Sequence, residues 1–161
     1  MTTDRCDSPA LGRRKRILAI ASGGGHWVQL LRLRPAFEHH ELVFATVNAA
    51  YRAQVTGHRF HLVTDATRWN KLKLIRMSLE LLWVLLRERP HVIVSTGAAP
   101  GYVALRLGRL LGAKTCWIDS IANVERLSMS GEQIGRHVHL WLTQWAHLAR
   151  PEGPRYLGAV L

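Results

Sequence analysis

The sequence has little cysteine and no apolar run long enough to cross a membrane. Only two of the 161 residues are cysteines, Cys6 and Cys116. Two cysteines cannot build the disulfide framework of a small secreted domain. The segment 1–16 is polar and ends in a basic cluster, so it does not have the apolar stretch of a signal peptide. These absences favour a protein of the reducing cytoplasm.

Acidic residues are also scarce, with 11 against 22 basic residues and a formal net charge of +11. Such an excess implies an anionic partner, which can be nucleic acid, an acidic membrane surface or a phosphorylated substrate. The sequence contains no zinc-ligand spacing, no RNP-like aromatic motif and no helix-turn-helix pattern. We therefore expect no nucleic acid partner, no metal and no cofactor. The basic residues lie beside long apolar runs, which favours an anionic membrane surface.

Apolar, strand-forming segments alternate with helical patterns along the chain. This alternation predicts one α/β domain over 16–161, with a Rossmann-like, doubly wound parallel sheet, after a flexible basic N-terminus over 1–15. A ligand is then expected at the carboxyl ends of the strands. The predicted helices cover 27–38, 70–89 and 102–111, and the predicted strands cover 16–21, 42–47, 60–63, 91–96, 114–118 and 138–143.

Three glycines end the first apolar strand just before a helical pattern. Glycines let the backbone turn sharply and approach a ligand closely, and the following helix offers free N–H groups to an anion. A histidine at this turn can move a proton near neutral pH. The spacing matches neither common nucleotide-binding fingerprint, so a plain strand-to-helix turn is the alternative. The predicted site residues here are Ser22, Gly23, Gly24, Gly25 and His26, with His26 as the candidate base.

A second glycine turn follows the strand predicted over 91–96 and precedes another helix. Two such turns after two strands of one parallel sheet are expected to lie side by side at the mouth of a cleft. This turn again places small residues before free N–H groups at a helix start. Its predicted binding residues are Gly97, Pro100 and Gly101.

Polar residues interrupt the chain after the strand predicted over 114–118. Asp119 and Glu125 are candidate bases or hydroxyl acceptors. Ser120 and Arg126 are candidate substrate ligands, since a guanidinium holds a phosphate well. The alternative is structural: Asp119 caps a helix, while Glu125 and Arg126 pair with each other.

The helix predicted over 70–89 is apolar nearly all round and has basic residues near both ends. Such a helix is too short in its densest stretch to span a bilayer, but it can lie in the lipid interface. The alternative is a sheet-covering helix whose surplus apolar face meets a protein partner. The residues predicted to contact a membrane are Trp69, Lys73, Arg76, Leu82 and Trp83.

Several of these segments together resemble the asparagine-linked-glycosylation protein fourteen family, whose bacterial branch includes exopolysaccharide and capsule glycosyltransferase subunits. The resemblance covers nearly everything from residue 16 to residue 161. It rests on Ser-Gly-Gly-Gly-His at 22–26, on the turn at 97–101, on the run 118–131 and on the segments 143–151 and 156–158. The run 118–131 is the most specific part.

The resemblance implies the acceptor-side half of a GT-B glycosyltransferase, with a separate subunit that binds the UDP-sugar. The pair would transfer a sugar to a polyprenyl-diphosphate-linked acceptor at the cytoplasmic face of the cell membrane, where this chain is peripheral. His26 is then the preferred base, with Asp119 and Glu125 in reserve. A non-catalytic membrane scaffold that activates a catalytic partner is the alternative. A dinucleotide-binding oxidoreductase is disfavoured by the glycine spacing.

Overall fold

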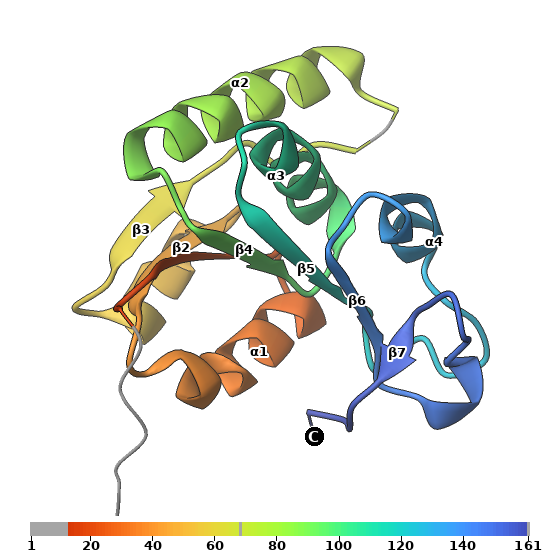
Figure 1. The fold of residues 1–161 in the computed structure, drawn as a ribbon. Helices are drawn as coiled ribbons and strands as arrows, with labels where there is room; N and C mark the ends of the chain where they lie inside the picture. The colour runs from red at the N-terminus through yellow and green to blue at the C-terminus, as the bar shows by residue number, and fades with distance from the viewer. Residues whose placement is uncertain (1–12, 68, 161) are drawn as a thin grey trace, which may run out of the picture.

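The chain folds around one parallel sheet of seven strands, in the order β3-β2-β1-β4-β5-β6-β7 (Figure 1). The structure is a computed structural model that describes residues 13–67 and 69–160. Most of the N-terminal segment predicted to be flexible, 1–15, lies outside the described residues. The strands are β1 (Arg16–Ile20), β2 (Glu41–Thr46), β3 (Arg59–Leu62), β4 (Val92–Ser95), β5 (Lys114–Ile118), β6 (Leu140–Thr143) and β7 (Arg155–Tyr156). The predicted Rossmann-like α/β fold is confirmed.

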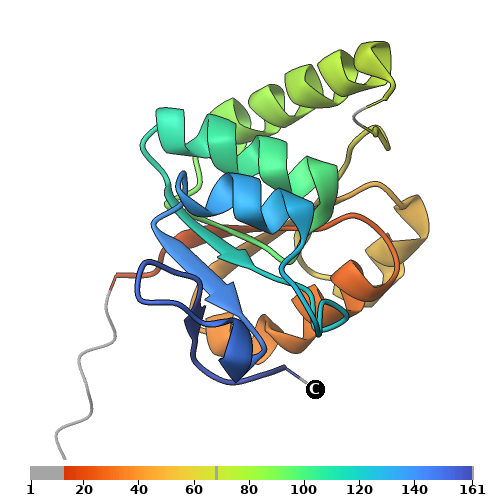
Figure 2. The same ribbon diagram turned by 90° about the vertical axis from the view of Figure 1, so that its right-hand side faces the viewer.

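Helices cover both faces of the sheet. Helix α1 (Gly25–Arg32) lies on one face, and α2 (Lys71–Glu88), α3 (Ala98–Leu110) and α4 (Met129–Gly135) form a layer on the other (Figure 2). Successive residues of β1 therefore enter different cores. Ile17 and Ala19 pack with Trp27 of α1, whereas Leu18 and Ile20 pack with α2 and α3. Burial on both faces explains why the strands are continuously apolar.

The helix boundaries differ from the sequence expectation in two places. The helix predicted over 27–38 begins at Gly25 and stops at Arg32, and a short 3₁₀ turn, η1 (Arg34–Phe37), follows it. Pro35, within this turn, has no backbone N–H with which to continue an α-helix. Helix α3 begins at Ala98 rather than at 102, with a proline in its first turn, where a missing N–H costs no hydrogen bond.

Four elements were absent from the sequence prediction. They are the helix α4, the two-residue strand β7 and the 3₁₀ segments η2 (Ala49–Val55) and η3 (Ala146–Leu148). Helix α4 is short, and its N-cap Ser128 accepts a hydrogen bond from the N–H of Gly131 (2.9 Å). Such a segment depends on its cap and its packing rather than on a long apolar period.

Polar contacts cap the start of helix α2 and hold its end against the sheet. At its start, Asn70 Oδ1 accepts a hydrogen bond from the N–H of Lys73 (3.0 Å). At its end, the buried Glu88 carboxylate lies 2.8 Å from Arg59 Nη1 and 2.8 Å from His61 Nε2, both on β3. These contacts set which face of α2 turns inward. They leave the opposite face to solvent.

We expect Leu81→Ala to lower the free energy of unfolding by about 2–5 kcal/mol, because Leu81 is completely buried and its loss opens a cavity. The matched control is Leu79→Ala on the same helix. Leu79 is 62% exposed, so its truncation should change stability by less than about 0.5 kcal/mol. Urea unfolding of the two variants measures the difference. Equal losses would contradict this orientation of α2.

Candidate functional site

The two glycine turns meet at the carboxyl edge of the sheet. β1 and β4 are neighbouring parallel strands, so the turns that follow them lie next to each other. His26 Nδ1 lies 2.9 Å from the carbonyl oxygen of Thr96. The Thr96 hydroxyl in turn donates to the carbonyl oxygen of His26 (2.6 Å). A Cβ atom at Gly97 would lie only 2.4 Å from His26 Nδ1, so this close approach requires a glycine.

The contact with Thr96 determines which nitrogen of the neutral His26 ring carries the proton. A carbonyl oxygen only accepts hydrogen bonds, so Nδ1 carries a proton, and in the neutral ring the lone pair is on Nε2. The ring is half-buried and lines a cavity. His26 is therefore prepared to accept a proton at Nε2, which is the chemistry expected of a general base.

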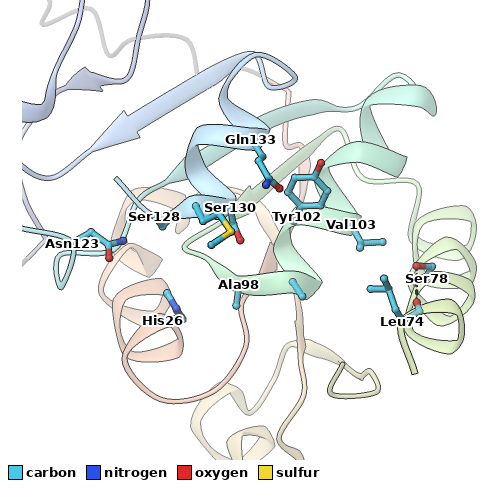
Figure 3. A pocket seen from close by; sticks show the side chains of 12 residues that line it. His26, Leu74, Ser78, Ala98, Tyr102, Val103, Asn123, Ser128, Ser130 and Gln133 are labelled. Carbon is cyan, nitrogen blue, oxygen red and sulfur yellow. Dashed lines mark hydrogen bonds between the residues drawn. The ribbon is translucent and has the colours of Figure 1, made fainter. Parts of the chain in front are cut away.

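This cavity, called the central cavity below, has a volume of about 530 Å³. His26 and Asn123 lie at one end, and Leu74 and Ser78 of α2 lie at the other (Figure 3). The remaining wall comes from α3, α4 and the segment before α4, and it consists of Ala98, Ala99, Tyr102, Val103, Ser128, Met129, Ser130 and Gln133. The cavity thus joins the candidate base to the helix predicted to contact a membrane.

Asp119 lies beneath this cavity rather than in its wall. The side chain is 1% exposed, and its two oxygens accept four hydrogen bonds from residues of the loop that follows. Two of the donors, Asn123 Nδ2 (2.6 Å) and Ser128 Oγ (3.1 Å), belong to side chains that line the central cavity. Gly131 packs so closely that a Cβ there would lie 2.1 Å from Asp119 Oδ2. This geometry favours a role in ordering the loop.

The other polar residues predicted in this segment lie apart from the cavity. Glu125 and Arg126 are exposed. They do not line the central cavity, and they form no ion pair with each other. The hydroxyl of Ser120 accepts a hydrogen bond from the N–H of Ala122 (3.3 Å). No contact among the described residues supports Glu125 as a base, Arg126 as a substrate ligand or an ion pair between the two.

Three side chains after β6 hold the same loop from the other side. Gln144 is buried, and its Nε2 donates to the carbonyl oxygen of Asp119 (2.9 Å) while its Oε1 accepts from the N–H of Val160 (2.8 Å). Trp145 Nε1 donates to the carbonyl oxygen of Ile121 (2.9 Å). His147 Nε2 lies 2.7 Å from the carbonyl oxygen of Val124. These side chains carry no local signal in the sequence, because their partners in the loop are more than 20 residues away.

A second cavity, called the polar cavity below, lies on the other side of the start of α3. Its volume is about 640 Å³. Four predicted binding residues line it, namely Ser22, Gly23, Gly24 and Pro100, together with Val47, Asn48, Tyr51, Asp65, Ala66, Thr67, Ala98 and Ala99. Tyr51 had no signal in the sequence, yet its hydroxyl accepts the N–H of Gly24 (3.0 Å) and its ring stacks on Trp27 with centroids 5.0 Å apart.

The remaining predicted glycines serve the turns rather than the cavity walls. Gly25 begins α1, and Gly97 makes room for His26. A Cβ at Gly101 would lie 1.9 Å from Ser95 Oγ, so Gly101 allows α3 to pack on β4. None of the three lines either cavity.

Helix α2 presents an apolar stripe to solvent. The stripe consists of Leu72, Ile75, Leu79, Trp83 and Leu86, each at least 54% exposed, and Trp69 precedes it with 81% exposure. Lys73 and Arg76 are exposed on the same helix, and Arg76 pairs with Glu80 (2.9 Å). Leu82 and Trp83 were both predicted as membrane contacts; Leu82 is half-buried, whereas Trp83 lies in the exposed stripe. Within residues 13–67 and 69–160, no helix is long and apolar enough to span a bilayer.

The described part of the chain contains no group of three or more His, Cys, Asp or Glu side chains placed to hold a metal ion. Burial raises the pKa of the Cys116 thiol to about 12, which keeps it protonated at neutral pH. Among the residues that line the central cavity, His26 and Tyr102 have ionisable side chains.

Comparison with known proteins gives a similarity of fold. No protein-family model matches the sequence, and no curated protein sequence matches it. The chain is similar to MurG from Acinetobacter baumannii, with a TM-score of 0.73, 11% identity, and coverage of 90% of this chain and 45% of that one. It is also similar to a putative UDP-N-acetylglucosamine 2-epimerase from Listeria monocytogenes, with a TM-score of 0.63, 10% identity, and coverage of 81% and 39%.

A third similar structure is the UDP-GlcNAc 2-epimerase of Methanocaldococcus jannaschii, with a TM-score of 0.51, 15% identity, and coverage of 64% of this chain and 31% of that one. The chain spans less than half the length of each of these three proteins. At such identities the similarity shows the fold alone. That fold is a Rossmann-like α/β unit with a parallel sheet.

We expect Asp119→Ala to lower the free energy of unfolding by about 2–4 kcal/mol, because several hydrogen bonds to one buried charge are lost together. Amide hydrogen exchange should rise over residues 120–128. The matched control is Glu125→Ala in the same loop, which removes an exposed carboxylate and should change stability by less than about 0.5 kcal/mol. An unchanged exchange rate in the loop of the Asp119 variant would refute the ordering role.

Proposed function

We propose that this chain is the acceptor-side half of a split glycosyltransferase, as the resemblance to the asparagine-linked-glycosylation protein fourteen family implies. A separate subunit supplies the UDP-sugar. The two together transfer the sugar to a polyprenyl-diphosphate-linked acceptor at the cytoplasmic face of the cell membrane. The similarity in fold to MurG supports the proposal that this chain is one half of such an enzyme.

The observation that carries the proposal is the course of the central cavity. It begins at His26, a candidate base at the carboxyl edge of the sheet, and reaches Leu74 and Ser78 of α2. The same helix carries an exposed apolar stripe on its outer side. An amphiphile with its chain at the α2 end and its polar head near His26 fits this arrangement. A soluble metabolite would not need the connection to α2.

In the proposed reaction His26 removes the proton of the attacking hydroxyl. The acceptor hydroxyl donates its hydrogen to Nε2, and its oxygen attacks the anomeric carbon of the UDP-sugar as the bond to UDP breaks. Nδ1–H stays bonded to the carbonyl oxygen of Thr96, which orients the ring and stabilises the imidazolium that forms. A positioned base typically contributes ~10²–10⁴-fold to such a step.

The start of α3 is the proposed contact for the acceptor diphosphate. Ala98 and Ala99 line both cavities, and they begin a helix whose first N–H groups have no partner within the helix. Ala98 has a φ of 65°, a left-handed conformation that is costly for a residue with a side chain. Backbone strain of this kind is commonly kept at ligand-binding turns.

The α2 stripe is the proposed membrane contact. Exposed leucine, isoleucine and tryptophan side chains gain free energy when they leave water for the acyl region of a bilayer. Lys73 and Arg76 lie on the same helix, where they can meet anionic headgroups. A helix that docks in this way holds the central cavity close to the lipid that enters it.

We expect His26→Ala, assembled with its donor subunit, to lose about 10²–10⁴-fold in turnover at saturating substrates, because the base is gone. Complex formation and lipid binding should be retained. His137→Ala, which removes an exposed histidine away from both cavities, is the matched control. This chain alone should transfer no sugar. A near-normal rate for the assembled His26 variant would leave a membrane scaffold that activates a catalytic partner as the better account.

We expect the double variant Leu79→Glu, Trp83→Glu to lose binding to vesicles that contain anionic lipid, while its circular dichroism stays unchanged. Both side chains are more than half exposed, so we expect the fold to tolerate their replacement. Leu157→Glu, at a leucine that is 74% exposed far along the chain, is the control and should still bind. Wild-type binding in a flotation assay should weaken with salt, because exposed charges are screened within ~10 Å at 0.1 M. Equal flotation of all three proteins would reject α2 as the contact.

A further inference from the structure

The polar cavity has the construction of a binding site. Four segments that are far apart in the sequence form its wall: the turn after β1, the segment after β2, the segment before α2 and the start of α3. All four lie at the carboxyl edge of the sheet, where ligands of this fold bind. A volume of about 640 Å³ falls within the usual size of small-molecule sites.

The wall offers hydrogen-bonding groups that the protein itself does not use. The Tyr51 oxygen accepts the N–H of Gly24, so the phenolic proton remains to be donated. Asn48 uses its Oδ1 to accept the N–H of Ala50, which leaves both protons of its amide nitrogen. The carboxylate of Asp65 forms no hydrogen bond or ion pair with any described residue. Ser22 and Thr67 add two hydroxyl groups to the same wall.

The charges of the described side chains in this wall disfavour an anion. Among the described residues that line the polar cavity there is no lysine, arginine or histidine, and Asp65 carries a negative charge. This contrasts with a chain whose net charge is +11. A phosphate here would meet a carboxylate without a compensating side chain. A neutral group with several hydroxyls, by comparison, can donate to Asp65 and accept from Tyr51 and Asn48.

The polar cavity also adjoins the proposed acceptor site. Ala98 and Ala99 belong to both walls, so the start of α3 is the partition between the two cavities. A ligand whose anionic part rests on this helix start can therefore extend one polar group into the polar cavity. The apolar part then points along the central cavity towards α2.

We infer that the polar cavity is a carbohydrate subsite that binds an uncharged sugar ring. Asp65 accepts hydrogen bonds from sugar hydroxyls, Tyr51 donates its phenolic proton to a ring substituent, and Asn48 donates from its amide. The choice of a sugar among neutral polyhydroxyl groups rests on the proposed function. The site itself rests on the cavity, its unused hydrogen-bonding groups and its charge.

The test is a nuclear magnetic resonance titration of the ¹⁵N-labelled full chain without any partner. The probes are methyl glucoside, methyl N-acetylglucosaminide and inorganic pyrophosphate. At least one glycoside should shift the amide signals of residues 23–24, 48–51 and 65–67, whereas pyrophosphate should leave 48–51 and 65–67 unchanged. Asp65→Asn and Tyr51→Phe should each weaken glycoside binding by about tenfold, the value of one good hydrogen bond. Glu152→Gln, at an exposed carboxylate outside both cavities, should bind as the wild type does.

Three results would overturn the inference. Neither glycoside shifts these signals, or the glycosides shift only central-cavity residues such as Ser130 and Gln133, or pyrophosphate shifts the signals of 48–51 and 65–67. The measurement needs no donor subunit and no sugar transfer, so it is independent of the proposed function. Glycoside binding by a chain whose assembled complex transfers no sugar would keep the subsite and reject the transferase. Sugar transfer by the complex, without glycoside binding by the chain alone, would keep the transferase and reject the subsite.

Discussion

The site depends on a reciprocal pair of hydrogen bonds between His26 and Thr96. Two hydrogen bonds run in opposite directions between these residues, and they join the turns that follow two neighbouring strands. The pair fixes the histidine tautomer, sets the position of the α3 start and thereby separates the two cavities. Gly97 is the residue that permits it, because any side chain there would collide with the imidazole. The two hydrogen bonds hold the turn after β1 against the turn after β4 at this edge of the sheet.

Local pattern was sufficient to predict the sheet but not the elements that depend on distant partners. The six predicted strands are found, because burial on both faces leaves continuous apolar runs such as Val92-Ile93-Val94. Helix α4 and strand β7 were missed. Seven residues of α4 are held by the Ser128 cap and by packing on α3 and β5, and β7 is two residues paired with β6. Neither leaves a periodic pattern in the sequence.

The same limit applies to the site. The sequence placed His26 correctly at a turn beside the second glycine turn, because both follow from strand order and glycine spacing. It could not separate a free carboxylate from a bonded one: Asp119 follows a strand in the same way as a catalytic aspartate does, but four loop donors surround it. Tyr51 and Asp65 lie in segments without a motif, and the fold alone brings them to the glycine turn. Their proposed roles depend on that convergence.

The basic excess of the chain and its cavities are spatially separate. Within the described residues, His26 is the sole Lys, Arg or His side chain in either wall, while basic side chains such as Lys73 and Arg76 lie exposed on α2. In the proposed function, side-chain charge therefore serves attraction to an anionic surface, which is long-ranged and weakened by salt. Recognition of the acceptor diphosphate depends on the N–H groups at the start of α3, which are directional and act at contact. A sugar ring is neutral, so its recognition needs neither basic side chains nor a helix start. The unused hydrogen-bonding groups of Asn48, Tyr51 and Asp65 are suited to it.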